Sequence, residues 1–452
     1  MKKPVHSFNF WYTFFRPLVE FTTRCHYHRL IVRGRENIPT DGSYIFAPCH
    51  QNALMEPLAV LCTTPRPVVF LARADIFAKP AIAAALNFLK IMPVYRIRDG
   101  KESLGKNQEI FDRSKQVLLD GVPFCLMAEG RHNDRHQLLP LVKGMFRIAG
   151  ETQLAMGDKP LYIVPTGIDY DEYERPFSNL VVNIGTPIPV QPFMEMYKQN
   201  EPMALNQMRD ALQAGLLEQM HDIRSREYYD ELNALCNACN RSVRKEDGLR
   251  NTAWNRFQVR HRIANRLDKM VADGCEKAAP IVHLGKEYRR VCAELKLNEK
   301  MPGERWNLAL LCLSTIAIAG ILLAAIWLPI IRGILLFCLI CYPIILIPTH
   351  LIARKLIKDP QFRSSVNYGI RFALSIIYTI ALGVIVGCRH GFWDGVTAFN
   401  TAFVMGFLSG DIVTWIRGTY DNWRYRIAQL LHRDKTQYLD QIIKEVASSM
   451  KA

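Results

Sequence analysis

A chain of 452 residues exceeds one ordinary domain, so its length predicts two or three parts. Its 57 basic and 42 acidic residues give a net charge of +15, which indicates an anionic partner, either nucleic acid or an anionic membrane surface. The twelve cysteines follow no framework or zinc-site spacing, which excludes a disulfide-stapled scaffold and favours reduced thiols in a cytoplasm-facing protein.

Residues 1–27 are rich in aromatic side chains on both sides of Tyr12. Those that precede Pro17 are Phe8, Phe10, Trp11, Tyr12, Phe14 and Phe15. Because aromatic rings concentrate at the boundary between lipid and water, this segment is predicted to form an interfacial helix. The alternative is that the rings pack on the globular domain. No apolar run or cleavage site of a secretory signal follows the basic start.

Residues 28–195 alternate short apolar strands with helices, a pattern typical of an α/β layered domain. The predicted strands are Leu30–Val32, Tyr44–Ala47, Val68–Ala72, Met92–Tyr95, Phe124–Met127, Tyr162–Val164 and Leu180–Ile184. The predicted helices are Glu56–Cys62, Ala81–Leu89, Lys106–Leu119 and Met145–Ala155. Ligands bind at the carboxyl ends of strands in open α/β sheets, so polar residues just after strands are the candidates for a site.

His50 follows the strand Tyr44–Ala47, and five residues separate it from Glu56. This spacing does not place the two side chains on one helix face. They can meet only if His50 lies in the loop after the strand and Glu56 in the first turn of the next helix. Such a pair could take a proton from an alcohol, because a carboxylate can hold the tautomer of an imidazole. The alternative is a helix-capping histidine beside a solvated first-turn acid.

Basic residues and a Glu-Gly turn follow the later strands. Arg96 and Arg98 share one side of a strand end, either as a phosphate-binding pair or as solvated edge arginines. Glu129, Gly130 and Arg131 follow a buried strand, and the glycine permits a sharp exit turn. Arg131 suits a phosphate because guanidinium binds phosphate oxygens in a fork, although a plain surface arginine is the alternative.

Residues 196–303 are predicted to form a basic helical appendage, beginning with amphipathic helices at Met203–Glu218 and Tyr228–Cys239. The cations that crowd its next segment are Arg241, Arg244, Lys245, Arg250, Arg256, Arg260, Arg262, Arg266 and Lys269. Interleaved with apolar residues and Trp254, they are typical of a membrane-surface element, and a solvated helical face is equally compatible. Nucleic acid is not an expected partner, because no nucleic-acid-binding motif accompanies the charge.

The carboxyl-terminal third is predicted to cross a membrane four times. Residues 304–350 form a first hairpin and residues 372–416 a second, each built from long apolar runs. A basic loop, 351–371, and a basic tail, 417–452, then lie on the cytoplasmic side. The expected location is the cell (inner) membrane, as a multi-pass protein with its α/β domain facing the cytoplasm.

The fourth apolar run, Val396–Ile416, is the weakest of the predicted spans because it contains Asn400 and Asp411. A re-entrant or interfacial segment is therefore the alternative to a span. Asp411 would be costly in lipid, so it is expected to face the helix bundle or to lie at the membrane interface.

The order of motifs between about residues 30 and 195 resembles the glycerolipid acyltransferase family, that is, the lysophosphatidate and glycerol-phosphate acyltransferases. The family's first motif is usually His, four residues, Asp, and its third reads Phe-Pro-Glu-Gly-Thr-Arg before Leu-Leu-Pro-Leu-Lys-x-Gly. Here the latter run is Leu138-Leu139-Pro140-Leu141-Val142-Lys143-Gly144. This chain departs from the pattern at Glu56, at Ala128, which replaces proline, and at Arg131, which follows the glycine directly instead of one residue later.

The resemblance implies that His50 is the catalytic base and Glu56 its orienting partner, with no covalent acyl-enzyme, no metal and no cofactor. The substrate-binding residues that it implies are Arg96, Arg98, Glu129, Gly130, Arg131, Lys143 and Pro165, the last shaping an acyl groove. The implied donor is a fatty acyl thioester, acyl-CoA or acyl carrier protein, and the implied acceptor is glycerol 3-phosphate or the lysophospholipid 1-acylglycerol 3-phosphate. A non-phosphate lyso-lipid acceptor and a non-catalytic membrane scaffold that keeps the fold are the alternatives.

Overall fold

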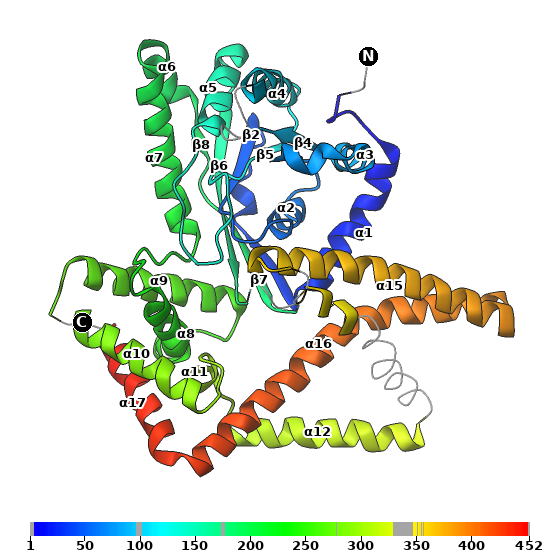
Figure 1. The fold of residues 1–452 in the computed structure, drawn as a ribbon, viewed down its shortest axis with the longest axis vertical. Coiled ribbons are helices and arrows are strands. Elements are labelled where there is room, and N and C mark those ends of the chain that lie inside the picture. Colours follow the sequence, from blue (N-terminus) through cyan, green and yellow to red (C-terminus); the bar gives the residue numbers. More distant parts are fainter. Residues whose placement is uncertain are drawn as a thin grey trace. The chain divides into compact units, whose positions relative to one another are not determined.

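The computed structural model describes residues 4–95, 102–172, 177–276, 278–328, 347–349, 351–353, 355 and 357–450. The chain divides into two compact units (Figure 1). The first, here called the α/β unit, consists of Met1–Arg24, Leu30–Asp171 and Leu180–Met220. The second, the helical unit, consists of Cys25–Arg29, Glu172–Asn179 and His221–Ala452.

A mixed eight-stranded sheet forms the centre of the α/β unit, in the order β1-β7-β6-β2-β5-β3-β4, with β8 also paired to β6. The strands are β1 (Arg29–Arg33), β2 (Ser43–Pro48), β3 (Val69–Arg73), β4 (Ile91–Val94), β5 (Phe124–Cys125), β6 (Leu161–Tyr170), β7 (Asn179–Ile184) and β8 (Ile188–Pro189). Strands β2 to β6 run parallel, whereas β7 and β8 run antiparallel to β6. The predicted α/β layered fold is confirmed for this unit.

Helices cover the sheet because its central strands are apolar on both faces, as parallel strands require. All six residues of β2 are buried, as are nine of the ten in β6. The helices of this unit are α1 (Phe10–His26), α2 (Met55–Leu61), α3 (Pro80–Phe88), α4 (Glu102–Leu119), α5 (Gly144–Met156), α6 (Met194–Gln199) and α7 (Glu201–Gln219). Each predicted strand and helix is present, although β5 is shorter and β6 longer than the sequence pattern indicated.

Helix α7 belongs to the α/β unit, so the predicted boundary at residue 195 moves to Met220. The helix lies on β6, where two glycines allow close packing. A Cβ on Gly215 would lie 2.8 Å from Cγ of Pro165, and a Cβ on Gly167 would lie 2.0 Å from the carbonyl oxygen of Gln219. This segment was predicted to be an amphipathic helix, and it covers one face of the sheet.

The helical unit has a core of its own. Helices α8 (Tyr229–Glu246), α9 (Ala253–Ala272), α10 (Ala278–Glu294), α11 (Met301–Glu304) and α17 (Arg433–Ser449) build it. Leu235, Tyr288 and Leu439 are fully buried together in this core. Because α17 contributes to it, much of the tail predicted for 417–452 is a packed structural element. Cys236 and Cys239 are free, buried thiols in the same core.

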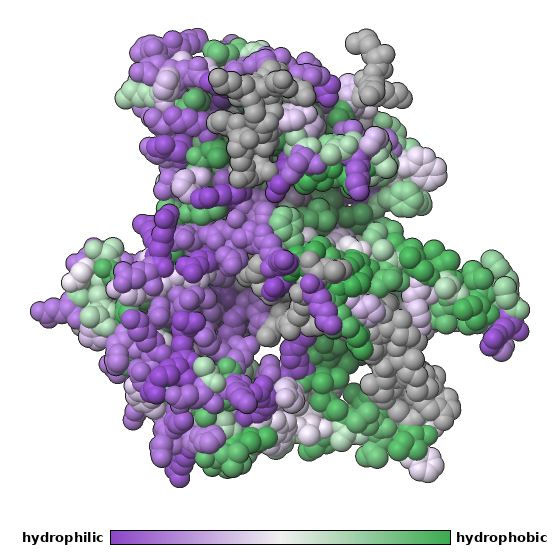
Figure 2. Space-filling model, in the orientation of Figure 1, coloured by the Kyte–Doolittle hydropathy of each residue, from purple (hydrophilic) through white to green (hydrophobic). Residues whose placement is uncertain are grey.

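Apolar helices extend from the helical core, and hydrophobic side chains gather on their surfaces (Figure 2). They are α12 (Leu308–Trp327), α15 (Pro360–His390) and α16 (Phe392–Leu431). Within the part of the chain that the structure describes, one helix, Gln361–His390, is long and apolar enough to cross a membrane, and Leu308–Ala324 is apolar but shorter. Most of the second arm of the predicted first hairpin lies outside the described residues. Four spans therefore stay a prediction.

The hairpin of α15 and α16 packs through glycines. A Cβ on Gly395 would lie 2.6 Å from the carbonyl oxygen of Gly383 and 2.7 Å from Cα of Gly387. Small residues let two helix backbones approach in this way, as in many membrane helix pairs. On α16, the Oδ1 atom of Asp411 lies 2.6 Å from Nδ1 of His28, so this carboxylate contacts an imidazole within the helical unit.

Candidate active site

His50 lies in the loop after β2, where neighbouring strands fix its backbone. The N–H of Cys49 donates to the carbonyl oxygen of Thr166 on β6 at 3.2 Å. The N–H of His50 donates to Oε1 of Glu129 at 2.7 Å. Glu129 itself comes after β5, the strand on the other side of β2. The histidine is thus positioned by two strands far apart in the sequence.

The side chains of His50 and Glu56 meet. Nδ1 of His50 donates to Oε2 of Glu56 at 2.8 Å, with Glu56 in the first turn of α2. Glu56 is fully buried, whereas the imidazole keeps 14% of its surface exposed. The structure therefore has His50 in the loop after the strand and Glu56 in the first turn of the next helix, as this contact requires. The hydrogen bond assigns the proton to Nδ1, so Nε2 is left to accept one.

The other oxygen of Glu56 is fully engaged as well. Oε1 accepts from the N–H of Gln51 at 2.9 Å and of Asn52 at 2.6 Å, and from the Tyr170 hydroxyl at 3.2 Å. Burial raises the pKa of the Glu56 carboxyl, while the hydrogen bond from His50 and those from the two backbone N–H groups lower it. A buried carboxylate needs such donors. They also hold it in one orientation toward His50.

Glu129, which the resemblance implies to be a substrate-binding residue, accepts hydrogen bonds from backbone N–H groups. Besides His50 N–H on Oε1, its Oε2 accepts from the N–H of Leu139 at 2.9 Å, and the residue is 3% exposed. Both oxygens thus bind backbone. Gly130 follows with a φ of 64°, and a Cβ there would lie 3.0 Å from Cγ1 of Val142. The glycine is needed for this turn, as its sequence context predicted.

The segment after Gly130 turns back over the His50 loop. The N–H of Asn133 donates to the carbonyl oxygen of His50 at 3.1 Å, and Nε2 of Gln51 donates to that of Arg135 at 3.3 Å. The His132 ring packs edge-on against the His50 ring, with centroids 5.3 Å apart and planes at 72°. These contacts place a second imidazole beside the first.

Sequence reasoning missed both His132 and Tyr170. The one available signal for His132 was its place two residues after Gly130, where the family pattern has arginine. Arg131, which was preferred instead, is exposed. Tyr170 lies at the far end of β6, which the sequence pattern ended six residues too early, so its reach to Glu56 could not be expected.

The remaining predicted residues are dispersed. Lys143 is exposed at the start of α5. Pro165 is buried within β6 and packs against Gly215 of α7, and its part in an acyl groove stays a prediction. Arg96 and Arg98 lie outside the described residues. The cluster that the structure does assemble comprises His50, Glu56, Glu129, Gly130 and the added His132 and Tyr170.

A second imidazole–carboxylate contact lies in the same loops. Nδ1 of His136 is 3.6 Å from Oδ1 of Asp169, which is 2% exposed. Asp169 shares its surroundings with Cys49, since burial and the carboxylates of Glu129, Glu56 and Asp169 all raise the pKa of that thiol. Three buried acids thus lie near Cys49, the residue before His50.

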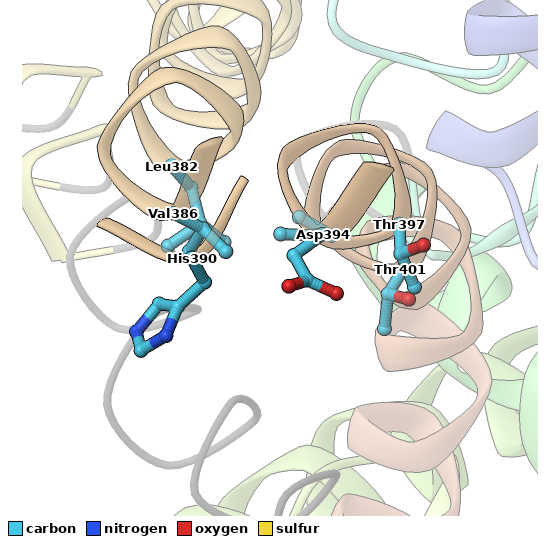
Figure 3. Close-up of a pocket in the computed structure, with 8 residues that line it drawn as sticks. Leu382, Val386, His390, Asp394, Thr397 and Thr401 are labelled. Atoms are coloured by element: carbon cyan, nitrogen blue, oxygen red, sulfur yellow. The ribbon is translucent and has the colours of Figure 1, made fainter. Parts of the chain in front are cut away.

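A separate hollow occurs in the helical unit, between α15 and α16 (Figure 3). His390 and Asp394 lie at the turn of the hairpin, with Leu382 and Val386 on α15 and Thr401 on α16. None of the predicted site residues lines it. The predicted site residues that the structure describes lie in the α/β unit instead.

Comparison with known proteins agrees with this assignment. The Acyltransferase family model matches residues 29–169, a segment that contains every strand from β1 to β5, most of β6, and every member of the His50 cluster except Tyr170. This match confirms the predicted resemblance to an acyltransferase family for residues 29–169.

Individual relatives are more distant. An uncharacterized acyltransferase of Schizosaccharomyces pombe is 29% identical over 114 residues, which are 25% of this chain and 16% of that protein. Among solved structures, the 1-acyl-sn-glycerophosphate acyltransferase PlsC of Thermotoga maritima matches with a TM-score of 0.32 and 18% identity, over 45% of this chain and 80% of that one.

Proposed function

We propose that this protein transfers a fatty acyl group from an acyl thioester, on CoA or acyl carrier protein, to the hydroxyl of glycerol 3-phosphate or 1-acylglycerol 3-phosphate. The observation that carries the proposal is the 2.8 Å contact between His50 Nδ1 and a buried Glu56 within an acyltransferase domain. An imidazole held in this way has Nε2 available as a general base. The domain match supports acyl transfer, and the acceptor is inferred from the motif resemblance.

In the proposed reaction, Nε2 of His50 takes the hydroxyl proton as the acceptor oxygen forms a bond to the thioester carbonyl carbon. The resulting imidazolium is stabilised by Glu56. The tetrahedral intermediate then expels the thiolate as its C–S bond breaks, and the imidazolium returns the proton to sulfur. The products are an ester and a free thiol, and no acyl group is ever attached to the protein.

The test is an acceptor survey with the purified full-length chain in lipid vesicles. Radiolabelled palmitoyl-CoA or palmitoyl carrier protein is supplied with glycerol 3-phosphate, 1-acylglycerol 3-phosphate or a non-phosphate lyso-lipid. We expect labelled ester with a phosphate acceptor, and an Arg131→Ala variant with a raised acceptor KM and an unchanged donor KM. Product formed from the non-phosphate acceptor alone would contradict the proposed acceptor. Thioester turnover with no ester product from any acceptor would contradict acyl transfer to an alcohol.

A further inference from the structure

Residues 131–138 form an irregular segment beside the proposed base, and we call this segment the site loop. None of its residues lies in a helix or a strand. The His132 ring packs edge-on against the His50 ring, and the N–H of Asn133 donates to the carbonyl oxygen of His50 at 3.1 Å. The position of the site loop therefore affects both the ring and the backbone of His50.

Hydrogen bonds within the site loop give it the shape of a turn. The N–H of Arg135 donates to Oδ1 of Asn133 at 3.2 Å, and the N–H of Gln137 donates to the carbonyl oxygen of Arg135 at 2.8 Å. Bonds of this kind shape the turn without fixing its place on the sheet. Its placement depends on contacts with other elements, such as the 3.3 Å hydrogen bond from Nε2 of Gln51 to the carbonyl oxygen of Arg135.

Asp169 on β6 makes a second contact of this kind. Its Oδ1 atom lies 3.6 Å from Nδ1 of His136, and the acid is 2% exposed, compared with 17% for the imidazole. Taking a carboxylate out of water is costly unless it gains a cation or hydrogen-bond donors. A protonated imidazole supplies a positive charge and an N–H group, so the buried acid draws His136, and the site loop with it, toward the sheet.

The last two residues of β6 support different parts of the site. Successive side chains of a strand point in opposite directions. The hydroxyl of Tyr170 donates to Oε1 of Glu56, the acid that orients His50, at 3.2 Å, whereas Asp169 contacts His136. Strand β6 is paired on both sides, with β2 and β7, so it offers a fixed support for the proposed base and for the site loop.

We propose that Asp169 and His136 are positioning residues for acyl transfer, which hold the site loop against His50 through their charge contact. The inference rests on the proposed function. The site loop begins with Arg131, the proposed ligand of the acceptor phosphate, so its placement sets the distance from that phosphate to the base. A phosphate at the correct distance brings the acceptor hydroxyl to Nε2 of His50. The pair acts through the loop and takes no proton from the substrate.

Steady-state kinetics of two variants test this role. Asp169→Asn removes the negative charge with little change of shape, and His136→Phe keeps a ring but removes its nitrogens. For each we expect kcat/KM toward the acceptor to fall about tenfold, mainly through a raised acceptor KM, while the donor KM stays within about twofold. His136→Asn keeps a nitrogen donor on the same side-chain carbon and should recover much of the loss. The exposed Asp158→Asn is the matched control and should match the unsubstituted protein.

The double variant of Asp169→Asn and His136→Phe should be no worse than the more impaired single variant, because the two side chains form one interaction. Losses that multiply in the double variant would contradict the pairing. A purely structural role would lower the thermal midpoint and leave the acceptor KM unchanged. An unchanged acceptor KM in both single variants, or equal rises in the two KM values, would therefore overturn the proposal. If Asp169→Asn fails to fold, His136→Phe still decides the outcome, since it alters the more exposed partner.

Hydrogen exchange of the full-length protein tests the placement of the site loop without any need for turnover. The peptide that contains residues 131–138 should exchange faster in Asp169→Asn than in the unsubstituted protein or in Asp158→Asn, because its N–H groups open more often. Unchanged exchange in Asp169→Asn would overturn the proposal. If the unsubstituted protein acylates no acceptor, the proposed function fails, while the exchange result still decides whether the pair fixes the loop.

Discussion

At the scale of single residues, the site depends on carboxylates that bind backbone as well as side chains. Glu56 orients His50 and also accepts from two N–H groups of the same loop, so one acid fixes both the imidazole and its backbone. Glu129 accepts hydrogen bonds from the N–H groups of both His50 and Leu139 and so links the two segments. An amide at position 129 would place its nitrogen against one of two N–H donors, and an amide at position 56 would favour the other tautomer of His50.

For Glu56→Gln we expect kcat to fall by about 10³-fold with little change in either KM, since the amide no longer favours the tautomer with Nε2 free. Steady-state kinetics and the thermal midpoint of the purified variant provide the check. Glu56→Asp, which keeps the charge but shortens the arm, should retain more activity than the glutamine variant. A Glu56→Gln enzyme with an unchanged kcat would show that this acid has no part in the reaction.

Glu129→Gln should lower the stability of the α/β unit by about 1–3 kcal/mol, because one buried N–H loses its acceptor. Hydrogen exchange of the peptide that contains Leu139 should therefore be faster in the variant than in the unsubstituted protein. The exposed Glu195→Gln serves as the control and should leave that peptide protected. Unchanged protection in Glu129→Gln would contradict the bridging role of this carboxylate.

At the scale of elements, the sequence predicted the order of strands and helices well, because buried parallel strands are apolar throughout and are separated by polar turns. The contact of His50 with Glu56 followed from that order together with the motif resemblance. The bridge made by Glu129 did not, since side-chain bonds to backbone N–H groups of distant segments leave no periodic trace. The packing of Pro165 against Gly215 of α7 was likewise not predicted, because it depends on which helix covers β6.

The α15–α16 hairpin provides a prediction about packing. In Gly395→Leu the new side chain would begin 2.6 Å from the Gly383 carbonyl oxygen, so the helices must separate, at a cost of about 1–3 kcal/mol. The variant should lose its folded peak at a lower temperature in detergent size-exclusion chromatography. Gly320→Leu in α12 is the matched control, because a Cβ there meets nothing within 4 Å. Equal thermal behaviour of both variants would contradict the close approach.

At the scale of the whole molecule, an α/β unit that resembles an acyltransferase domain is joined to a helical unit that carries long apolar helices. The sequence could not reveal that α17 completes the helical core, because a short amphipathic helix at the end of a basic segment resembles a solvated tail. The sequence also predicted α3 as a helix of the α/β domain without indicating that its apolar side chains would be exposed. Packing between distant segments decided both outcomes.

The predicted crossing of α15 is tested by labelling. If α15 spans the membrane and the α/β unit faces the cytoplasm, the turn at Asp394 lies on the opposite side. In a background with the exposed native thiols replaced, Asp394→Cys should react with a membrane-impermeant maleimide in intact cells, whereas Asp273→Cys should react only after the membrane is opened. Reaction of both cysteines in intact cells, or of neither, would contradict this topology.

The rate of acyl transfer by His50→Ala is the most direct test of the proposed mechanism. Removing the imidazole leaves Glu56 and Glu129 in place, and the substituted protein should insert into membranes and unfold much as before. With a saturating thioester and the preferred acceptor, we expect turnover to fall by about two to four orders of magnitude. Turnover equal to that of the unsubstituted protein would show that His50 is not the base.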